Sequence, residues 1–295
     1  MNTVEQRRAG YVALVGRTNA GKSTFLNAVL EAKAAIISDR PQTTRKRILG
    51  VKTSARGQIV FFDSPGIHKP LFKLNDRMMK EVHGILEDAD VVLYFIDVND
   101  DREDEFVLSL LRQAAKPTFL LINKIDTVRK SKILERIDKW RLLFPWREIV
   151  PISALKMDNV DRVLDLVLTV LPVGEYFYPE DACTFQSEKH YVAELIREQL
   201  LGEVRDELPF ATTVVVEEIT DKGRVIFVRA EVYVETQSQK KIIIGRHGSL
   251  TKRIGEGSRR ELEEYFGKQV FIDLFIKVVP DWRNSSQFLQ QMFDS

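Results

Sequence analysis

GRTNAGKS, residues 16–23, is the stretch that decides the fold of this 295-residue chain. It fits the pattern G-x-x-x-x-G-K-[ST] and lies between a short apolar run, residues 11–15, and a helical period that begins at Lys22. A glycine-rich loop between a strand and a helix presents backbone N–H groups to phosphate. We therefore expect the loop to surround a β-phosphate, Lys22 to reach the β- and γ-phosphates, and Ser23 to bind Mg²⁺. The residues expected to contact the phosphates are Gly16, Arg17, Thr18, Asn19, Ala20, Gly21, Lys22, Ser23 and Thr24.

A second motif indicates which base is bound, because the first loop does not distinguish ATP from GTP. It is Asn123-Lys124-Ile125-Asp126, at the end of a predicted strand. A carboxylate can accept hydrogen bonds from the N1–H and the N2 amino group of guanine, whereas adenine has an acceptor at N1, so the wrong base would leave buried polar groups unpaired. The turn Ser153-Ala154-Leu155 ends the next strand and is expected to direct a backbone N–H at guanine O6. The sequence therefore predicts GTP.

Two loops between these motifs are expected to respond to the γ-phosphate. In Asp63-Ser64-Pro65-Gly66, followed by Ile67, the aspartate is expected to hold Mg²⁺ through water and the Gly66 N–H to contact the γ-phosphate. The other loop is Gln42-Thr43-Thr44-Arg45, in which one threonine can bind Mg²⁺ only while triphosphate is present. We favour Thr44 over Thr43. The predicted catalytic residues are Lys22, Thr44 and Gly66, and the predicted Mg²⁺ ligands are Ser23, Thr44 and, through water, Asp63.

The order of strands and helices predicts an α/β domain over residues 8–173, with a mixed, mostly parallel sheet and helices on both faces. The expected strands are residues 11–15, 59–62, 91–97, 118–122 and 149–152. The expected helices are residues 22–31, 72–86, 103–114, 131–140 and 160–170. The motifs at residues 16–23, 63–66, 123–126 and 153–155 then each lie at the carboxyl end of a strand, where such sheets bind ligands. Periodicity stops in residues 174–187, which we interpret as a linker.

A second, α+β domain is predicted over residues 188–283, before a tail of residues 284–295. Its order is helix 188–207, strands 212–219 and 224–236, helix 238–244, a Gly-x-x-G loop, helix 249–266 and strand 270–278. The loop, Gly245-Arg246-His247-Gly248, joins two helices and has no base-reading partner, so it differs from a nucleotide loop. Its cationic surroundings suggest a nucleic-acid backbone. The predicted RNA-binding residues are Lys241, Gly245, Arg246, His247, Gly248, Lys252, Arg253 and Trp282.

Each of these features has a simpler structural interpretation. Arg259 and Arg260 with Glu263 and Glu264 can form pairs across one exposed helix face. Trp282 either stacks on a base or packs on its own domain. The apolar residues beside the loop, Ile242 to Ile244 among them, are expected to belong to the core.

With PQTTRKR (41–47) and DSPGIHKP (63–70), the first domain resembles translation-factor-related GTPases, specifically the Era family, and the second resembles a type II KH domain. The resemblance covers residues 11 to about 283. Ile67 stands where Ras-like enzymes have a water-orienting glutamine, and an isoleucine cannot orient water. The resemblance implies hydrolysis assisted by backbone groups, Mg²⁺ and potassium, with Asn19 either a potassium ligand or a brace for the turn. His68 is interpreted as a solvated loop residue rather than a general base.

The resemblance also implies partners. We expect a GTP/GDP switch that binds the 3′ region of 16S ribosomal RNA and assists 30S subunit assembly and 16S maturation. The protein is expected to be monomeric and cytoplasmic, with peripheral association at the inner face of the cell membrane. An alternative is a GTPase that serves RNA modification or another maturation factor through a protein-docking C-terminal domain. Another is a constitutive RNA-binding protein that holds nucleotide as a static cofactor.

Composition sets limits but selects no partner. The net charge is +1, so only local clusters of charge can argue for nucleic acid. Cys183 is the single cysteine, which excludes an internal disulfide. The N-terminal residues lack the apolar core of a signal peptide, and no apolar run approaches the ~20 residues needed to span a bilayer.

Overall fold

The computed structural model describes residues 7–294 except 39, 41 and 68–70. These residues form two compact units. The first unit contains the described residues of 1–35, 44–69 and 77–185, and the second contains those of 36–43, 70–76 and 186–295. Two short segments from the N-terminal half of the sequence thus belong to the second unit, which the sequence did not predict.

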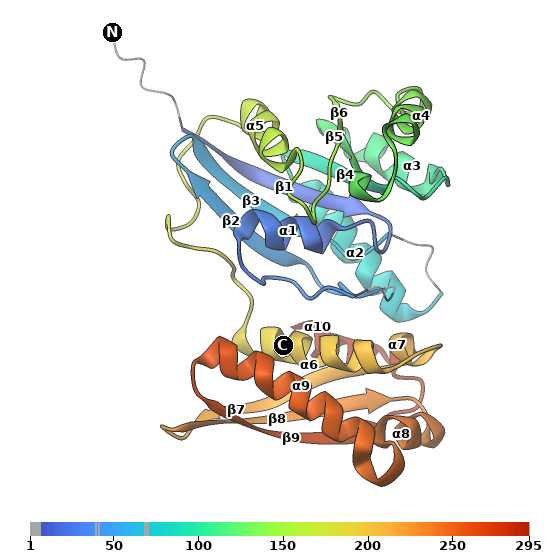
Figure 1. Cartoon of the computed structure of the whole chain (residues 1–295), viewed down its shortest axis with the longest axis vertical. Helices are drawn as coiled ribbons and strands as arrows, with labels where there is room; N and C mark the ends of the chain where they lie inside the picture. Colours follow the sequence, from blue (N-terminus) through green and yellow to red (C-terminus); the bar gives the residue numbers. More distant parts are fainter. Residues whose placement is uncertain (1–6, 39, 41, 68–70, 295) are drawn as a thin grey trace. The chain divides into compact units, whose positions relative to one another are not determined.

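The first unit is a six-stranded sheet between two layers of helices (Figure 1). Its strands are β1 (Arg8–Gly16), β2 (Ile48–Ser54), β3 (Gly57–Asp63), β4 (Val91–Asp97), β5 (Thr118–Asn123) and β6 (Ile149–Pro151). Its helices are α1 (Lys22–Leu30), the greater part of α2 (Lys73–Asp88), α3 (Glu105–Ala114), η1 (Ile125–Thr127), α4 (Lys130–Trp140) and α5 (Val160–Val170). The order across the sheet is β2-β3-β1-β4-β5-β6, and all neighbours are parallel except β2 and β3.

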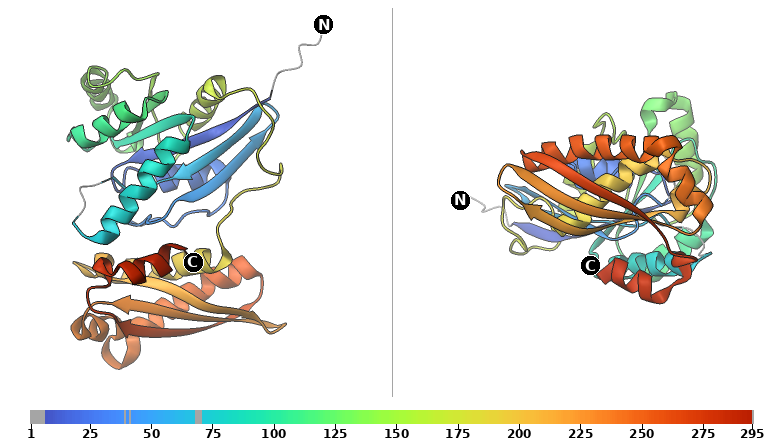
Figure 2. Two further views of the ribbon diagram at one scale, coloured as in Figure 1. Left: turned by 180° about the vertical axis from the view of Figure 1, so that it is seen from behind. Right: turned by 90° about the horizontal axis from the view of Figure 1, so that it is seen from below.

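Each face of this sheet buries its own core. Residues of α1 and α5 pack on one face, and residues of α2, α3 and α4 pack on the other. Helix α1 lies on the side seen in Figure 1, and α2 lies on the side seen from behind in Figure 2. The central strands are therefore covered on both sides and are continuously apolar, as the sequence predicted.

The antiparallel edge strand β2 was missed in the sequence analysis. Its sequence, ILGVKTS, is short and interrupted by Gly50, so it has weak strand character. The glycine has a packing reason, because a Cβ there would lie 2.7 Å from the methyl carbons of Leu26 and Leu30 on α1. The close approach of α1 to the strand therefore needs this glycine.

The segment expected to be a linker packs on the first unit as far as Phe185. The side-chain amide of Gln58 accepts from the N–H groups of Phe177 and Tyr178 and donates to the Tyr178 carbonyl. Further along, the Val51 N–H donates to the Cys183 carbonyl at 2.8 Å. The segment is thus an extended connection without regular secondary structure, held on the first unit by the Gln58 side chain and by the edge strand β2.

The second unit is a three-stranded sheet with helices on one face (Figure 2). Its elements are α6 (Glu188–Glu203), α7 (Leu208–Ala211), β7 (Thr213–Asp221), β8 (Val225–Val234), α8 (Gln237–Ile244), η2 (Arg246–Gly248), α9 (Ser249–Phe266), β9 (Gln269–Val278), η3 (Trp282–Asn284) and α10 (Ser286–Asp294). Strand β8 is antiparallel to β7 and parallel to β9. The long helices α6 and α9 supply most of the helical core residues. Helix α10 lies in the predicted tail and was not expected.

Candidate nucleotide site and nucleic-acid interface

The glycine-rich loop joins β1 to α1, as the sequence predicted. Gly21 has φ +94°, and a Cβ there would overlap the side-chain amide of Asn123. Lys22 is buried, and its Nζ donates to the carbonyls of Gly16 (3.1 Å) and Arg17 (3.0 Å). Burial lowers the pKa of Lys22, and the nearby carboxylate of Asp63 opposes that change. The ammonium group therefore bonds to the carbonyls at the start of the phosphate loop, where a bound phosphate could accept from it.

The side chains of the loop differ in what they contact. The Arg17 guanidinium lies 3.3 Å from Asp104 and 3.9 Å from Asp100, so its charge faces α3 and the end of β4. Asn19 has a left-handed backbone, with φ 63°. Any contact that Arg17 makes with phosphate from this position would come from its backbone.

The loop of residues 63–67 packs directly on the phosphate loop. A Cβ at Gly66 would lie 2.8 Å from the Thr18 nitrogen, so only glycine allows this approach. The Ile67 N–H donates to the Gly16 carbonyl at 3.1 Å, and the Ile67 side chain is buried in the core. Ser64 is fastened by its hydroxyl to the Leu14 carbonyl at 2.6 Å. The adjacent His68 lies outside the described residues.

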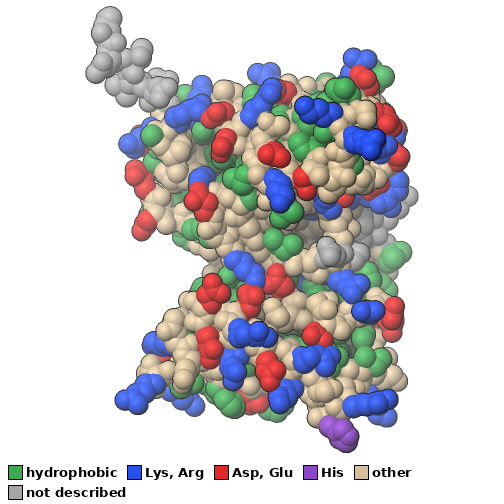
Figure 3. Space-filling view, viewed as in Figure 1, with side chains coloured by type: hydrophobic (Ala, Val, Ile, Leu, Met, Phe, Trp, Pro, Cys, Tyr) green, Lys and Arg blue, Asp and Glu red, His purple; other side chains and the backbone are tan. Residues whose placement is uncertain are grey.

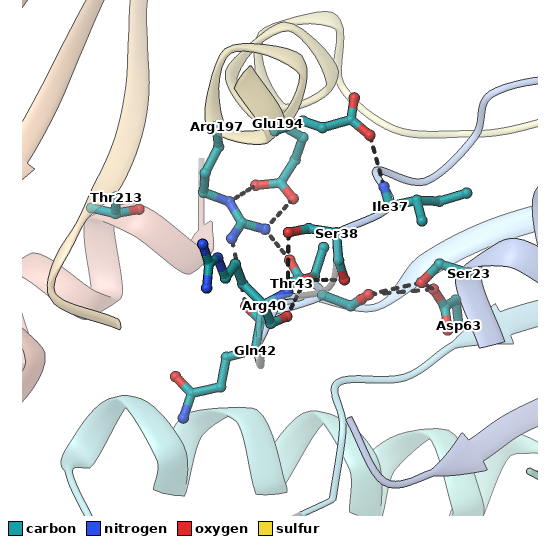
Figure 4. Close-up of polar contacts among 12 residues, drawn as sticks. Ser23, Ile37, Ser38, Arg40, Gln42, Thr43, Asp63, Glu194, Arg197 and Thr213 are labelled. Atoms are coloured by element: carbon teal, nitrogen blue, oxygen red, sulfur yellow. Dashed lines mark hydrogen bonds and ion pairs between the residues drawn. The ribbon is translucent and has the colours of Figure 1, made fainter. Parts of the chain in front are cut away.

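The side-chain oxygens of Ser23, Thr44 and Asp63 form a cluster, of which Figure 4 labels Ser23 and Asp63. The Ser23 hydroxyl donates to Asp63 Oδ2 at 2.6 Å and lies 3.1 Å from the Thr44 hydroxyl, which is itself 3.5 Å from Asp63 Oδ2. The Thr43 hydroxyl instead donates to the Arg40 carbonyl at 2.6 Å. The structure thus brings Thr44, and not Thr43, to the oxygen cluster.

The chemistry of this cluster fits Mg²⁺. Two hydroxyls and a carboxylate are hard oxygen donors, and Mg²⁺ commonly completes its shell with water and substrate phosphates. Asp63 is fully buried, and its Oδ1 has no hydrogen-bond partner among the described residues. Burial raises the pKa of Asp63, against the Lys22 charge and the hydrogen bonds from Ser23 and Thr44. A cation would compensate this buried carboxylate, so the residues present are suited to the ion.

The predicted guanine-reading residues meet at the ends of β5 and β6. Asn123 is buried and joins three loops, since its Nδ2 donates to the Ala20 carbonyl (2.8 Å) and its Oδ1 accepts from the Ala154 N–H (3.0 Å). The Ser153 hydroxyl donates to Asp126 Oδ1 at 2.6 Å and so orients that exposed carboxylate. Lys124 pairs with Asp97 at 2.9 Å, Ile125 begins η1, and the Leu155 side chain is exposed.

The turn of residues 153–155 was expected to direct a backbone N–H at guanine O6. In this structure the Ala154 N–H donates instead to the Asn123 side chain. The Lys156 N–H donates to the Ser153 hydroxyl at 3.1 Å. The turn is thus held by the side chains of Asn123 and Ser153.

The second glycine loop is built for a close backbone approach. Gly245 and Gly248 have φ +72° and +77°, and His247 between them is also left-handed at φ 50°. A Cβ at Gly245 would lie 2.8 Å from the Leu250 nitrogen, whereas a Cβ at Gly248 would meet nothing within 4 Å. Arg246 and His247 are exposed. The outer side of the loop at Gly248 is therefore open to a ligand.

The cations around this loop are not a continuous patch. Arg253 pairs with Glu203 of α6 at 2.9 Å, and Lys252 lies 3.9 Å from Glu256. Arg259 lies 4.0 Å from Glu263, as the simpler interpretation of that helix face predicted. Figure 3 shows basic and acidic side chains interspersed on the face in view. Lys241 and Arg246 at the loop are exposed, so the loop is the better-defined anion site.

Two sequence predictions for the second unit are wrong. Ile242 was expected in the core, but it is 51% exposed. Trp282 was included among the RNA-binding residues, with packing on its own domain as the open alternative, and it is fully buried, with its Nε1 donating to the Ala211 carbonyl at 3.0 Å. Because the indole has no exposed surface and contacts Ala211 and Phe288 of the same unit, Trp282 is unavailable to RNA. The alternative, a tail tryptophan that packs on its own domain, is the observed one.

The sequence also failed to identify that the described residues of 36–43 and 70–76 belong to the second unit. Ile36 is buried in the core of that unit. The Arg283 guanidinium lies 4.1 Å from the centre of the Phe72 ring, and the Lys73 N–H donates to Asn284 at 3.2 Å. The sequence signal that could have indicated this is Ile36-Ile37, a pair of apolar residues in a loop where exposed polar residues are more usual.

None of the helices in the part of the chain that the structure describes is both long and apolar enough to cross a membrane.

Comparison with known proteins follows the same division of the chain. Residues 11–124 match the family described as "50S ribosome-binding GTPase", and residues 207–283 match the KH domain. GTPase Era of Heliobacterium modesticaldum is 38% identical over 291 residues, with 97% of each chain covered. GTPase Era of Staphylococcus haemolyticus is 41% identical over 290 residues, again with 97% of each covered.

Two solved structures are similar over nearly the whole chain. One is a crystal structure of Era in complex with MgGDPNP and nucleotides 1506–1542 of 16S ribosomal RNA, with a TM-score of 0.93 and 38% identity. The other is an Aquifex aeolicus Era variant bound to GDP and AlF₄⁻, with a TM-score of 0.92 and 38% identity. In each comparison 96% of this chain and 98% of the other is covered.

Proposed function

This chain belongs to the Era family of GTPases, and from that premise we propose that it is a GTP-driven switch that binds the 3′ region of 16S ribosomal RNA and assists 30S subunit assembly. The observation that carries the proposal is the presence, in one chain, of a complete guanine-nucleotide constellation and an open Gly-x-x-G loop. The similar Era structure with MgGDPNP and a 16S fragment supports the choice of RNA.

Hydrolysis would depend on positioning and electrostatics. Lys22 and the backbone N–H groups of the phosphate loop would hold the β- and γ-phosphates, and the Gly66 N–H would contact the γ-phosphate. Ser23, Thr44 and, through water, Asp63 would hold Mg²⁺, which when bound neutralises charge on the phosphate oxygens. The Ile67 side chain is buried among core residues, so the water must be oriented by other groups. We expect slow intrinsic turnover, with Asn19 the residue that would bind potassium.

Turnover by Lys22→Ala tests the catalytic part. Removing one preorganised donor to a developing oxyanion reduces rates by roughly 10²–10³-fold, and for a charged donor we expect a loss of at least about that size. Lys132→Ala, which removes a partly exposed lysine on α4, is the control and should hydrolyse GTP normally. Equal rates in the two variants would contradict the proposal, and the static-cofactor alternative requires that neither variant nor the parent turns over GTP.

Gly248→Asp tests the RNA part. Its side chain would project from the open side of the loop, where a carboxylate would repel a phosphate backbone. Gly248→Asn is the matched control, because asparagine also tolerates a left-handed backbone and carries no charge. We expect filter binding to a 16S 3′ fragment to weaken about tenfold or more for Asp relative to Asn. Unchanged RNA binding in both would favour the protein-docking alternative.

The choice of ribosomal RNA can be tested by comparing binding to RNA from the small and the large subunit. The GTPase family description names the 50S subunit, whereas the RNA in the similar Era structure is from 16S. We favour 16S because that similarity includes the second unit. Tighter binding to a 23S fragment than to the 16S fragment would overturn this choice.

Nucleotide should change RNA affinity, because Thr44 and Gly66 lie in loops expected to respond to the γ-phosphate. Linkage then requires RNA to change the affinity for GTP analogue by the same factor. Identical RNA affinities with GTP analogue, GDP and no nucleotide would exclude this coupling. Peripheral membrane association stays a prediction, which co-sedimentation with anionic vesicles would test.

A further inference from the structure

Residues 97–99, where β4 ends, lie beside the motif that is expected to read guanine, within the first unit. Asp97 pairs in register with Asn123 of the neighbouring strand β5. One residue later, the Val98 N–H donates to the Asn123 carbonyl at 3.0 Å. The backbones of the two segments are therefore still joined where the base-reading residues begin, and the side chains that follow β4 can contact the turn of residues 124–127.

Asp97 has a partner for each of its two carboxylate oxygens. Its Oδ2 lies 2.9 Å from the Lys124 ammonium group. Its Oδ1 accepts from the Asn99 N–H at 2.8 Å and from the Asn99 Nδ2 at 3.2 Å. An ion pair between partly exposed side chains adds little stability. What this carboxylate chiefly fixes is therefore the placement of the Asn99 amide and of the Lys124 side chain.

Asn99 extends this connection to the far side of the turn. Its Nδ2 donates to the Thr127 hydroxyl at 2.9 Å, and that hydroxyl donates to the Lys124 carbonyl at 2.7 Å. All of these bonds are compatible, because an amide nitrogen has two hydrogens and a hydroxyl can donate and accept at once. Asp97 and Asn99 therefore hold residues 124 and 127, which lie on either side of Asp126.

The turn needs such support because its first residue has an unfavourable backbone. Lys124 has φ 65° and ψ 33°, in the left-handed region that a lysine rarely adopts. Such a conformation costs free energy and persists where surrounding contacts impose it. The Ile125 N–H donates to the Ile152 carbonyl at 3.2 Å, which holds the turn from the side of β6. Asp97 and Asn99 hold it from the side of β4.

We propose that Asn99 is a positioning residue for base selectivity. It joins Asp97 to Thr127 and so holds the turn in the shape in which the Asp126 carboxylate meets the N1–H and the N2 amino group of guanine. The Ser153 hydroxyl orients the Asp126 side chain, whereas the bonds from Asn99 fix the backbone that carries it. The inference rests on the proposed role of Asp126 in reading the base.

The test compares Thr127→Val, which removes the hydroxyl and nearly keeps the side-chain shape, with Thr127→Ser, which keeps the hydroxyl. The measured quantity is the ratio of the affinities for GDP and inosine diphosphate, which lacks the N2 amino group. We expect this ratio to fall about three- to tenfold in Thr127→Val and in Asn99→Ala, because a displaced Asp126 loses its contact with that group. In Thr127→Ser it should stay within about twofold of the parent.

A structural role alone would give a different result. If these bonds only stabilised the fold, the affinities for both nucleotides would fall together and their ratio would not change, which would overturn the proposal. Asn99 and Thr127 are exposed, so neither substitution removes a buried side chain, and thermal denaturation should show that both variants fold.

Asp126→Ala separates this inference from the proposed function. If Asp126 reads the amino group, this variant loses most of the discrimination, and adding Thr127→Val should lower the ratio no further. A further fall in the double variant would overturn the positioning role of Asn99. A ratio that Asp126→Ala leaves unchanged would instead overturn the base contact of Asp126, and this inference with it.

Thr169→Val is the matched control for loss of a threonine hydroxyl. Thr169 on α5 is also exposed, and its hydroxyl donates to the Leu166 carbonyl at 2.6 Å, three residues earlier in the chain, as Thr127 donates to Lys124. We expect the ratio of the two affinities to be unchanged in this variant. A fall as large as that in Thr127→Val would show that the ratio does not report the turn, and would contradict the proposal.

Discussion

Asp126 is the residue on which base selectivity depends. Its carboxylate is oriented by the Ser153 hydroxyl, and an ionised carboxylate presents only acceptors to the base. Asp126→Asn places an amide donor where guanine has its amino group. We expect GTP affinity to fall about 100-fold or more, and affinity for xanthosine triphosphate, which has a carbonyl at that position, to rise. Competition binding with labelled nucleotide measures both.

The control for this substitution is Asp161→Asn, which changes an exposed carboxylate in the first turn of α5 and should leave both affinities unchanged. A GTP affinity that survives Asp126→Asn would show that another group reads the base.

Asp63 should make nucleotide binding depend on pH. Because burial raises its pKa, the carboxyl binds a proton at a pH where a solvated aspartate is ionised. A protonated Asp63 loses an acceptor for metal-bound water. We therefore expect binding of GTP analogue in Mg²⁺ to be full above the raised pKa and to weaken on acidification, beginning above the usual aspartate range. Titrations with a fluorescent analogue at several pH values would measure this.

The same titrations in EDTA should lack that acidic limb, and Asp63→Asn should remove it in Mg²⁺. Coincident profiles with and without the metal would argue against a metal-linked role for Asp63.

At the scale of elements, the C-terminal tail is structural. Trp282 begins η3, is covered by its own unit and donates to the Ala211 carbonyl, while Met292 of α10 is also buried. Trp282→Phe keeps an aromatic ring but leaves that carbonyl without its donor. We expect the free energy of unfolding to fall by about 1–3 kcal/mol, with RNA affinity unchanged within about twofold. Chemical denaturation and filter binding measure the two effects.

Gly248→Asp should show the opposite pattern, with weaker RNA binding and little change in stability. A Trp282→Phe variant of normal stability that had lost RNA binding would restore the base-stacking role.

The helices and strands that could be predicted are those whose apolar sequence pattern matches the side chains they bury in the fold. Strand β4 is buried on both faces and apolar throughout, and α9 begins and ends where its sequence predicted, at Ser249 and Phe266. Strand β2 and helix α10 were missed for different reasons. Strand β2 pairs with β3, which follows it after a tight turn, but Gly50 and the polar residues after it give β2 a weak strand pattern. Helix α10 is short and packs on residues distant in sequence, such as Thr213 and Tyr233, which a local window does not include.

At the scale of the whole molecule, the two compact units do not coincide with two stretches of sequence. Ile36 precedes β2 of the first unit but is buried in the core of the second. Ile36→Ala should therefore lower the stability of the second unit by about 2–4 kcal/mol, because a buried isoleucine leaves a cavity. Hydrogen exchange should show faster opening in β8, although the substituted residue lies before the second strand of the chain.

Ile37→Ala is the matched control, because the adjacent side chain is 46% exposed and its bond to Glu198 uses the backbone. An exchange increase confined to the first unit would show that Ile36 does not stabilise the second.

The motif residues were predictable because their spacing fixes their chemistry. A glycine loop followed by Lys22 and Ser23, and a carboxylate at Asp126, can be recognised from sequence, since each acts through a few consecutive residues. Two adjacent threonines are locally equivalent, however, and only the fold brings Thr44 to Ser23 and sends the Thr43 hydroxyl to Arg40. The same holds for Trp282, whose burial decides between a base contact and a core contact.

The sequence by itself thus determined the nucleotide chemistry, the α/β and α+β classes and the glycine loop of the second unit, because these follow from local periodicity and from backbone geometry at glycine. Only the tertiary structure decided that Ile36 and Thr43 are held by the second unit through Arg197 and its neighbours on α6. Such contacts join residues about 150 positions apart along the chain. These pairs form because apolar side chains pack together and because a buried guanidinium needs hydrogen-bond acceptors. Neither cause produces a repeating pattern in the sequence, so neither pair could be predicted from it.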